Sequence, residues 1–255
     1  MPDHTLKQFD TELEEIRSRV LQMGGLVEQQ IIRAIQALTE GHVGIAREVM
    51  NNDHRVNALE VAIDEECSTV IARRQPAAKD LRMIMTVVKT ITDLERIGDE
   101  AAKIARMTLS LYGAGRPTIP RAAEIQHVAD IALGMLRNAL DAFARLDLAV
   151  AAKVVRQDEQ VDSEFKAILR QLITFMMEDP RTISHALDIL FIAKSIERIG
   201  DHAKNMSEYV VYLVKGKDVR HTSVETLERE ALSGQSCVVH SFASSESRQP
   251  CGPTG

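Results

Sequence analysis

The sequence predicts an all-α protein, a tandem repeat of two three-helix bundles with six long antiparallel helices. Three observations lead to this fold. Of the 255 residues, 45% are hydrophobic and 27% are charged, but only 4% are aromatic and Trp is absent, a composition typical of helices packed on aliphatic side chains. Apolar residues recur with helical spacing over most of residues 5–217. A five-residue motif also occurs once in each half of the chain, which indicates a repeat.

The predicted helices span residues 5–39, 45–73, 78–111, 121–145, 148–177 and 182–215. Asp147 and Thr182 stand at N-cap positions, and Pro120 stands at a helix start. The strongest break is Gly113-Ala-Gly-Arg-Pro117, which separates three helices from the next three. We therefore predict a first repeat over residues 1–112, a linker over 113–120, a second repeat over 121–217 and a largely disordered tail over 218–255.

The repeated motif carries two carboxylates. Glu95-Arg-Ile-Gly-Asp99 returns letter for letter as Glu197-Arg-Ile-Gly-Asp201, 102 positions later. In each copy the Glu and the Asp are four residues apart, so both project from one side of a helix. A second pair of segments, residues 53–57 and 158–162, aligns with a shift of 105 positions.

Hairpin arithmetic predicts what faces these carboxylates if the second and third helices of each repeat are antiparallel. Asp158 is 22 residues before Pro180 and Asp201 is 21 after it, while Asp162 is 18 before and Glu197 is 17 after. Because both helices rise equally per residue, each pair should lie level across the hairpin.

The first repeat gives the same result around Pro76. Asp53 is 23 residues before Pro76 and Asp99 is 23 after it, while Asn57 is 19 before and Glu95 is 19 after. Oxygen ligands gathered at one level repel each other unless a cation lies among them. The sequence thus predicts two metal sites for Mg²⁺, Mn²⁺, Fe or Zn²⁺, with the candidate ligands Asp53, Asn57, Glu95, Asp99, Asp158, Asp162, Glu197 and Asp201.

At these residues the chain resembles the PhoU family. The resemblance covers about residues 5–230 and includes both copies of the Glu-Arg-Ile-Gly-Asp motif, Arg74-Gln-Pro-Ala-Ala-Lys-Asp-Leu-Arg82, Met177-Glu-Asp-Pro-Arg-Thr182 and the segment 209–217. It implies tandem three-helix bundles whose acidic motifs bind mono- or multinuclear metal clusters. Asn57 departs from the Asp of the family pattern, which should weaken or reshape the first site.

The resemblance further implies a cytoplasmic, homodimeric regulator that is not an enzyme. It would link the phosphate ABC transporter, through its ATPase subunit, to a sensor histidine kinase as a negative regulator of phosphate-starvation signalling. Association with the membrane would occur only through these partners.

Several alternatives remain open at this point. Arg96, Arg198 or nearby Lys side chains could neutralise the carboxylates as ordinary surface ion pairs in a metal-free helical scaffold. A ferritin-like di-metal enzyme would need Glu-x-x-His on two helices, and the sequence has one, Glu124 to His127. His202, beside Asp201, could be a ligand in the second metal site, but we expect it to be a surface histidine. We expect Glu60 and Asp64 to be surface charges.

The net charge, the N-terminal residues and the cysteines predict the partners and the location of the protein. The formal net charge is −6 and no run of basic residues occurs, so nucleic acid is not an expected partner. Residues 1–8 lack the pattern of a secretion signal and no apolar stretch is long enough to cross a bilayer. The three cysteines are not spaced as a disulfide framework. A cytoplasmic location is therefore predicted.

Overall fold

The computed structural model describes residues 2–113, 122–219, 222, 225–226 and 229–230, and these residues form an all-α fold, as predicted. The first half contains α1 (Pro2–Glu40), α2 (Val43–Asn52), α3 (His54–Arg74) and α4 (Ala78–Gly113), and the second contains α5 (Ala122–Arg145), α6 (Leu148–Glu178) and α7 (Ile183–Lys215). A short 3₁₀ turn (Pro180–Thr182) precedes α7. Gly113 is the last residue of α4, and the rest of the predicted linker and most of the predicted tail lie outside the described residues.

The predicted helix over 45–73 is wrong in one respect, because it is divided at Asp53 into α2 and α3. The division falls in Asn51-Asn-Asp-His54, whose side chains compete with backbone hydrogen bonds and so weaken a helix interior. His54 Nδ1 lies 2.6 Å from the Asn51 carbonyl oxygen. The equivalent helix of the second repeat, α6, is continuous.

The two predicted caps differ in outcome. The Asp147 carboxylate accepts hydrogen bonds from the backbone N–H groups of Ala149 and Val150, at 2.8 and 3.1 Å, and so caps α6. The side chain of Thr182 makes no capping bond to α7; its hydroxyl donates to the Asp179 carbonyl oxygen at 2.7 Å. Thr182 therefore occupies the predicted N-cap position of α7, but its side chain does not cap the helix, because the local chain, through Asp179, forms a 3₁₀ turn first.

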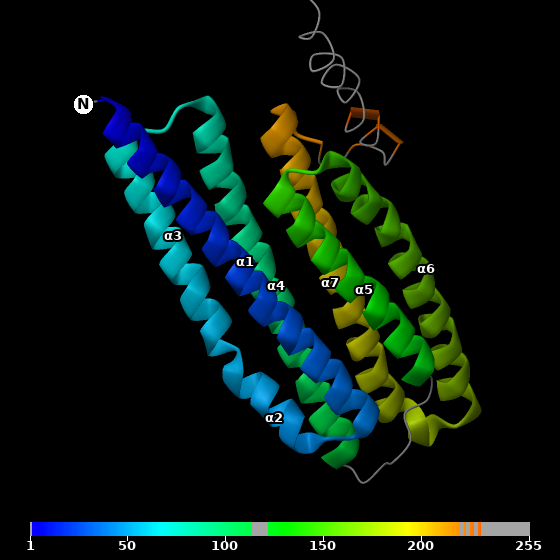
Figure 1. Ribbon diagram of the computed structural model, residues 1–255. Coiled ribbons are helices and arrows are strands. Elements are labelled where there is room, and N and C mark those ends of the chain that lie inside the picture. Colours follow the sequence, from blue (N-terminus) through cyan, green and yellow to red (C-terminus); the bar gives the residue numbers. More distant parts are fainter. Residues whose placement is uncertain (1, 114–121, 220–221, 223–224, 227–228, 231–255) are drawn as a thin grey trace, which may run out of the picture.

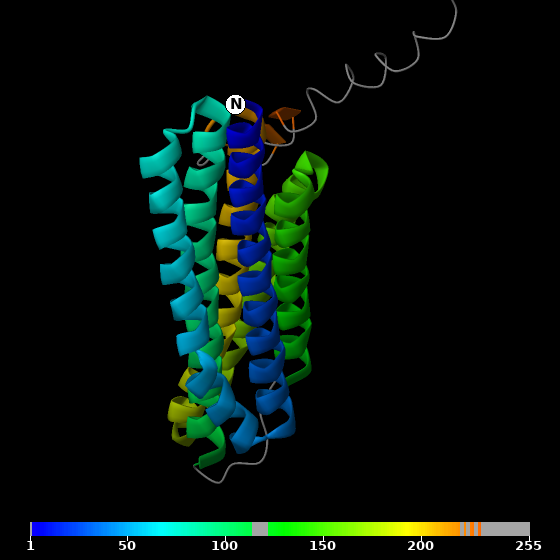
Figure 2. The ribbon, with the colours of Figure 1, turned by 60° about the vertical axis from the view of Figure 1, so that its left-hand side comes forward.

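The two repeats lie side by side, with α4 and α7 at the centre and α3 and α6 on the outer sides (Figure 1). The two central helices are antiparallel, since α4 runs from the upper to the lower end of the view and α7 runs back (Figure 1). Two contacts show the antiparallel direction. Glu100 of α4 pairs with Arg198 of α7, and Ser110, farther along α4, pairs with Asp188, which comes earlier in α7. The turned view shows α1 running along the same bundle (Figure 2). Gly98 and Gly200 of the repeated motif therefore lie near the same level.

The core is built from aliphatic side chains, as the composition suggested. Ile84, Ile91, Leu94, Ile97 and Ile104 of α4 are at most 1% exposed. The helices of both repeats contribute to one contiguous apolar core. None of the helices in the described part of the chain is long and apolar enough to cross a membrane.

Candidate functional site

The glycine of each repeated motif lies where two helices approach closely. A Cβ atom built on Gly98 of α4 would lie 3.5 Å from Val56 Cγ1 and 3.6 Å from Asp53 Oδ1. A Cβ atom built on Gly200 of α7 would lie 3.5 Å from Val161 Cγ1. The missing side chain thus lets the neighbouring helix, α3 or α6, pack against the motif. This packing brings Asp53 next to the motif's own carboxylates.

The first carboxylate cluster consists of Asp53, Glu60, Glu95 and Asp99, on α3, α4 and the joint between α2 and α3. Burial raises the pKa of Asp53, and the charge of Asp99 raises it further. Burial also raises the pKa of Glu95, with added repulsion from Asp99, Glu60 and Asp53. Asp53 Oδ1 is buried and has no hydrogen-bond partner. The structure thus brings three of the four predicted first-site residues together.

Glu60 and Asn57 of α3 differ from expectation at the first cluster. Glu60 was expected to be an ordinary surface charge, but it is half-buried and close enough to Glu95 to raise that residue's pKa. Its position one turn beyond Asn57 on α3 was the available signal. Asn57 itself is exposed, and among the described residues its side-chain amide makes no hydrogen bond to the cluster. Glu60 therefore joins the candidate ligands, and Asn57 remains a predicted one.

The second carboxylate cluster consists of Asp158, Asp162, Glu197 and Asp201, on α6 and α7, as predicted from the hairpin. Burial raises the pKa of Asp201 to about 6, and repulsion from Glu197, Asp158 and Asp162 contributes. Asp158 and Glu197 are buried, with 6% and 8% of each residue exposed. Four carboxylates that influence one another in this way need cations nearby.

In the second cluster those cations are lysines. Lys204 Nζ lies 2.6 Å from Asp158 Oδ2, and Lys194 Nζ lies 2.6 Å from both carboxylate oxygens of Glu197. The predicted alternative partner Arg198 binds Glu100 on α4 instead, at 2.8 Å. The two ammonium groups therefore neutralise part of the cluster's negative charge.

The clusters have the donor chemistry of a hard-cation site. All eight charged ligands are carboxylates, which Mg²⁺, Mn²⁺ and Fe accept, and the unpaired Asp53 Oδ1 gives the first cluster a free acceptor. Within the described residues, no three His, Cys, Asp or Glu side chains are arranged around one point as a metal would require. Binding an ion therefore requires side-chain rotation, and in the second cluster it requires displacement of a lysine.

Next to the motifs, α4 and α7 share buried polar pairs. His202 is 6% exposed and its Nδ1 lies 2.8 Å from Asp93 Oδ1, so the expectation of a surface histidine is wrong. Its equivalent in the first repeat, Glu100, is 2% exposed and binds Arg198 and Lys103, each at 2.8 Å. The reason is that this flank of each helix faces the other repeat rather than solvent.

The di-metal motif of a ferritin-like enzyme lies apart from both clusters. Glu124 and His127 are on α5, which approaches the second motif through Met135, 3.7 Å from a Cβ built on Gly200. Glu124 precedes Met135 by eleven residues, about 16 Å along a helix. The Glu-x-x-His pair does not join the carboxylates that the structure gathers.

Comparison with known proteins shows that both repeats of this chain match one protein family. The family model described as PhoU domain matches residues 20–108 and 125–210. The phosphate-specific transport system accessory protein PhoU homolog of Pseudomonas putida is 50% identical over 228 residues, 89% of this chain and 88% of that protein. The accessory protein PhoU of Escherichia coli is 46% identical over 226 residues, 89% of this chain and 93% of that protein.

Solved structures show the same arrangement of helices. The crystal structure of PhoU from Pseudomonas aeruginosa is 48% identical and superposes with a TM-score of 0.79, covering 82% of this chain and all of that one. The phosphate transport system regulatory protein PhoU from Streptococcus pneumoniae is 30% identical with a TM-score of 0.77, covering 83% of this chain and 99% of that one.

Proposed function

We propose that this chain, which belongs to the PhoU family, is a cytoplasmic, non-enzymatic accessory protein of phosphate uptake that represses the phosphate-starvation response while phosphate is plentiful. The observation that carries the proposal is its 46–50% identity to proteins named for this accessory role, over 89% of its length. Both repeats contribute to the match. The proposed partners are the ATPase subunit of the phosphate transporter, a sensor histidine kinase and a second copy of the chain.

The metal-binding part of the proposal rests on the two carboxylate clusters. Asp53, Glu95 and Asp99, with Glu60 and Asn57, would hold ions at the first cluster. At the second, the ligands would be Asp158, Asp162, Glu197 and Asp201. Burial, and then repulsion between carboxylates, raises the pKa values of Asp53, Glu95 and Asp201; a bound divalent ion would supply positive charge that offsets both effects. The protein's own contribution is to hold ligands from two helices at one level, so that binding ties these helices together.

A regulator needs broad rigid faces more than a reaction centre, and the antiparallel helices provide them (Figures 1 and 2). The clusters lie on the central helices α4 and α7 and on their outer neighbours α3 and α6. Ion binding would stiffen these helix pairs and so fix the surface that a partner meets. The state of the transporter would reach the kinase through contact, without a chemical step.

A metal-free scaffold is the second candidate. Lys194 and Lys204 already bind Glu197 and Asp158, so the second cluster is partly neutralised without an ion. The same regulatory role would then depend on the helical surface alone. The ferritin-like enzyme has no comparable observation in its favour.

The regulatory role is tested by complementation. A bacterial strain lacking its own PhoU protein and carrying an alkaline phosphatase reporter of the starvation response should express the reporter even in high phosphate. We expect this chain to restore repression, with reporter activity falling at least tenfold. An Asp64→Ala/Glu65→Ala variant, which removes two exposed carboxylates of α3 outside both clusters, serves as the control and should restore repression equally. Failure of the folded wild-type chain to repress in the strain it comes from would overturn the proposal.

A further inference from the structure

A small pocket opens in the first repeat where the second predicted helix is broken. It lies between α1, the end of α2 and the start of α3, with a volume of about 260 Å³. This is below the roughly 300–1,000 Å³ of pockets for drug-sized ligands, so the occupant must be small. The residues that line it are Leu26, Gln29, Gln30, Arg33, Val49, Asn52, Arg55 and Val56.

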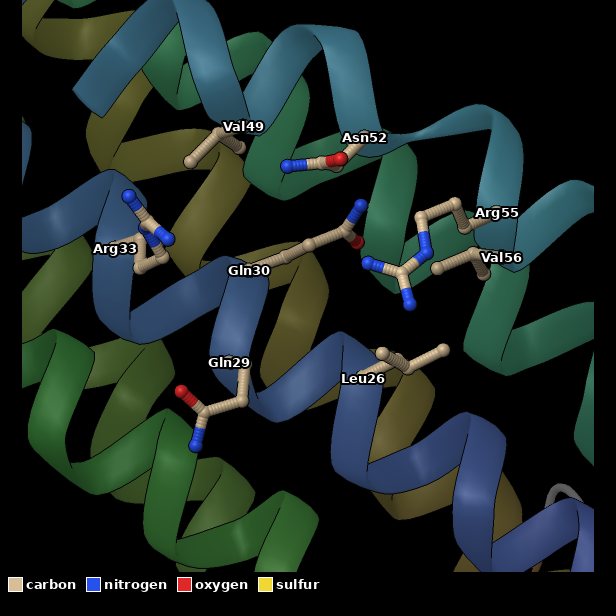
Figure 3. A pocket seen from close by; sticks show the side chains of 8 residues that line it. All are labelled: Leu26, Gln29, Gln30, Arg33, Val49, Asn52, Arg55 and Val56. Atoms are coloured by element: carbon tan, nitrogen blue, oxygen red, sulfur yellow. The ribbon is translucent and has the colours of Figure 1, made fainter. Parts of the chain in front are cut away.

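The polar side chains of this pocket are either neutral or positively charged. Figure 3 shows the amide of Gln30 between the side chains of Asn52 and Arg55, with Arg33 farther along α1. Two guanidinium groups and three side-chain amides line the pocket, together with the apolar side chains of Leu26, Val49 and Val56. Gln30 is 7% exposed. Among the described residues its Oε1 has no hydrogen-bond partner, and it can accept a bond from a ligand hydroxyl. The neighbouring guanidinium of Arg55 suits an oxyanion.

The charge of this pocket stands out in an acidic chain. None of its lining residues is Asp or Glu, although the sequence has 37 of them; Asp53, which is hydrogen-bonded to Gln30, lies just outside it. The other four pockets described each include at least one carboxylate, for example Asp130, Asp80, Glu66 and Asp188. Arg33 is paired with Glu48, but Arg55 has no ion pair among the described residues. The pocket therefore retains an unneutralised cation.

The second repeat provides an internal comparison. Gln30 of α1 lies next to Gly98, and Met135 of α5 lies next to Gly200. Gln30 and Met135 are therefore equivalent residues of the two repeats, 105 positions apart. By this shift Arg33 corresponds to Asn138 and Arg55 to Gln160. The second repeat thus has a thioether and two neutral amides where the first has an amide and two guanidiniums. The positive charge is not required to build the bundle.

From this geometry we propose that the pocket binds a phosphate-type oxyanion, either free phosphate or a small phosphate monoester. Arg55 supplies the unneutralised charge, Arg33 borders the site while paired with Glu48, and the bidentate guanidinium geometry matches a tetrahedral oxyanion. The amides of Asn52, Gln29 and Gln30 can accept as well as donate. They therefore suit inorganic phosphate, whose dianion still carries one proton, better than sulfate, which has none, or a phosphate monoester, which is mostly deprotonated at neutral pH. The proposal is independent of the regulatory role, since either can fail while the other holds.

Isothermal titration calorimetry of the full chain in phosphate-free buffer tests this binding. The probes are inorganic phosphate, glycerol phosphate as a monoester, and sulfate. We expect saturable binding of one phosphate-type anion per chain, with sulfate at least tenfold weaker. Tighter binding of inorganic phosphate would identify the free ion as the ligand, and tighter binding of glycerol phosphate would identify a monoester. Absence of saturable binding, or equal affinity for sulfate, would overturn the proposal.

Matched variants locate the site. Gln30→Met/Arg33→Asn/Arg55→Gln installs the residues of the second repeat and should weaken phosphate binding at least tenfold. Arg145→Asn/Arg170→Gln removes two exposed arginines outside the pocket and should leave binding unchanged. If the triple variant fails to fold, the exposed Arg55→Gln change alone should weaken binding at least threefold. Unchanged affinity in the folded pocket variants would overturn the site assignment.

Discussion

His202 Nδ1 lies 2.8 Å from Asp93 Oδ1 across the contact between α4 and α7. The two side chains come from different repeats and are 6% and 2% exposed. Asn205 reaches the same Asp93 oxygen at 3.5 Å. Because removing one member leaves the other buried without its partner, this pair contributes to the docking of the two repeats.

The pair predicts a specific pattern in a double-mutant cycle. His202→Ala should lower the free energy of unfolding by on the order of 2–4 kcal/mol, because the Asp93 carboxylate loses its hydrogen bond in a buried site. Asp93→Ala should lower the free energy of unfolding less in the His202→Ala variant than in the wild type. Urea denaturation of the four proteins measures this coupling. Strictly additive losses would mean that the two side chains do not stabilise each other.

Asp201 predicts how stability depends on pH. Its pKa is raised from 3.8 to about 6, so the folded state favours the protonated form. This favourable contribution is complete below pH about 4 and is lost as pH rises through 6. In metal-free protein, Asp201→Asn should therefore match the wild type near pH 4 and be more stable near pH 7, by at most about 3 kcal/mol.

Chemical denaturation at several pH values checks this trend. The exposed Asp64→Asn change is the control and should show no such difference from the wild type. A stability difference between Asp201→Asn and wild type that shrinks between pH 4 and pH 7 would contradict the assigned environment. Metal should bind more tightly over the same rise in pH, because it needs the ionised carboxylate.

Lys204 predicts opposite effects on stability and on metal binding. Its ammonium group lies 2.6 Å from Asp158, so Lys204→Gln leaves a buried carboxylate without its counter-charge and should destabilise the metal-free protein. The same change removes a competing cation, so the affinity of the second cluster for Mn²⁺ should rise roughly two- to tenfold. Calorimetric Mn²⁺ titration measures it, with the exposed Lys153→Gln as control. Weaker Mn²⁺ binding by Lys204→Gln would contradict a metal site at Asp158.

The two motif glycines should differ in their tolerance of alanine. A Cβ on Gly200 would make ordinary contacts at 3.5 and 3.7 Å, whereas one on Gly98 would lie 3.1 Å from Gln30 Oε1. Gly200→Ala should therefore gain up to about 1 kcal/mol of stability from helix propensity. Gly98→Ala should gain less or lose stability, since the buried Gln30 must move. Thermal unfolding compares the two variants. A higher melting temperature for Gly98→Ala than for Gly200→Ala would refute this prediction.

The helices and the level carboxylates could be predicted because they depend on local periodicity. Regular spacing of apolar residues indicates a helix. Two antiparallel helices rise by the same distance per residue from the turn that joins them, so residues at nearly equal separations from Pro180 lie at one level. Asp158 and Asp201 are such a pair, and they are close enough for Asp158 to raise the pKa of Asp201. The break at Asp53 could not be predicted in the same way. Weak helix formers such as Asn51 and Asn52 occur inside helices as well as between them.

The residues that were misjudged are those whose surroundings depend on contacts between helices distant in sequence. Whether His202 is buried depends on α4 packing against α7, and one helix's pattern does not show which flank meets another repeat. Comparison of the repeats predicts a surface charge at Glu60, because its repeat equivalent, Phe165, is not acidic. A comparison of the two repeats identifies functional residues that both repeats share and overlooks those, such as Glu60, that occur in only one repeat. The pocket at Arg55 was missed for the same reason.

The central claim, that the two acidic clusters bind metal, is tested most directly by elemental analysis. The purified chain is loaded with Mn²⁺ or Fe²⁺, separated from free ions by gel filtration, and compared with Glu197→Ala/Asp201→Ala, Glu95→Ala/Asp99→Ala and the Asp64→Ala/Glu65→Ala control. The account predicts stoichiometric metal in the wild type and the control, and loss of part of it in each cluster variant while helicity is retained. Metal-free wild-type protein after loading, or equal metal in all four proteins, would contradict it.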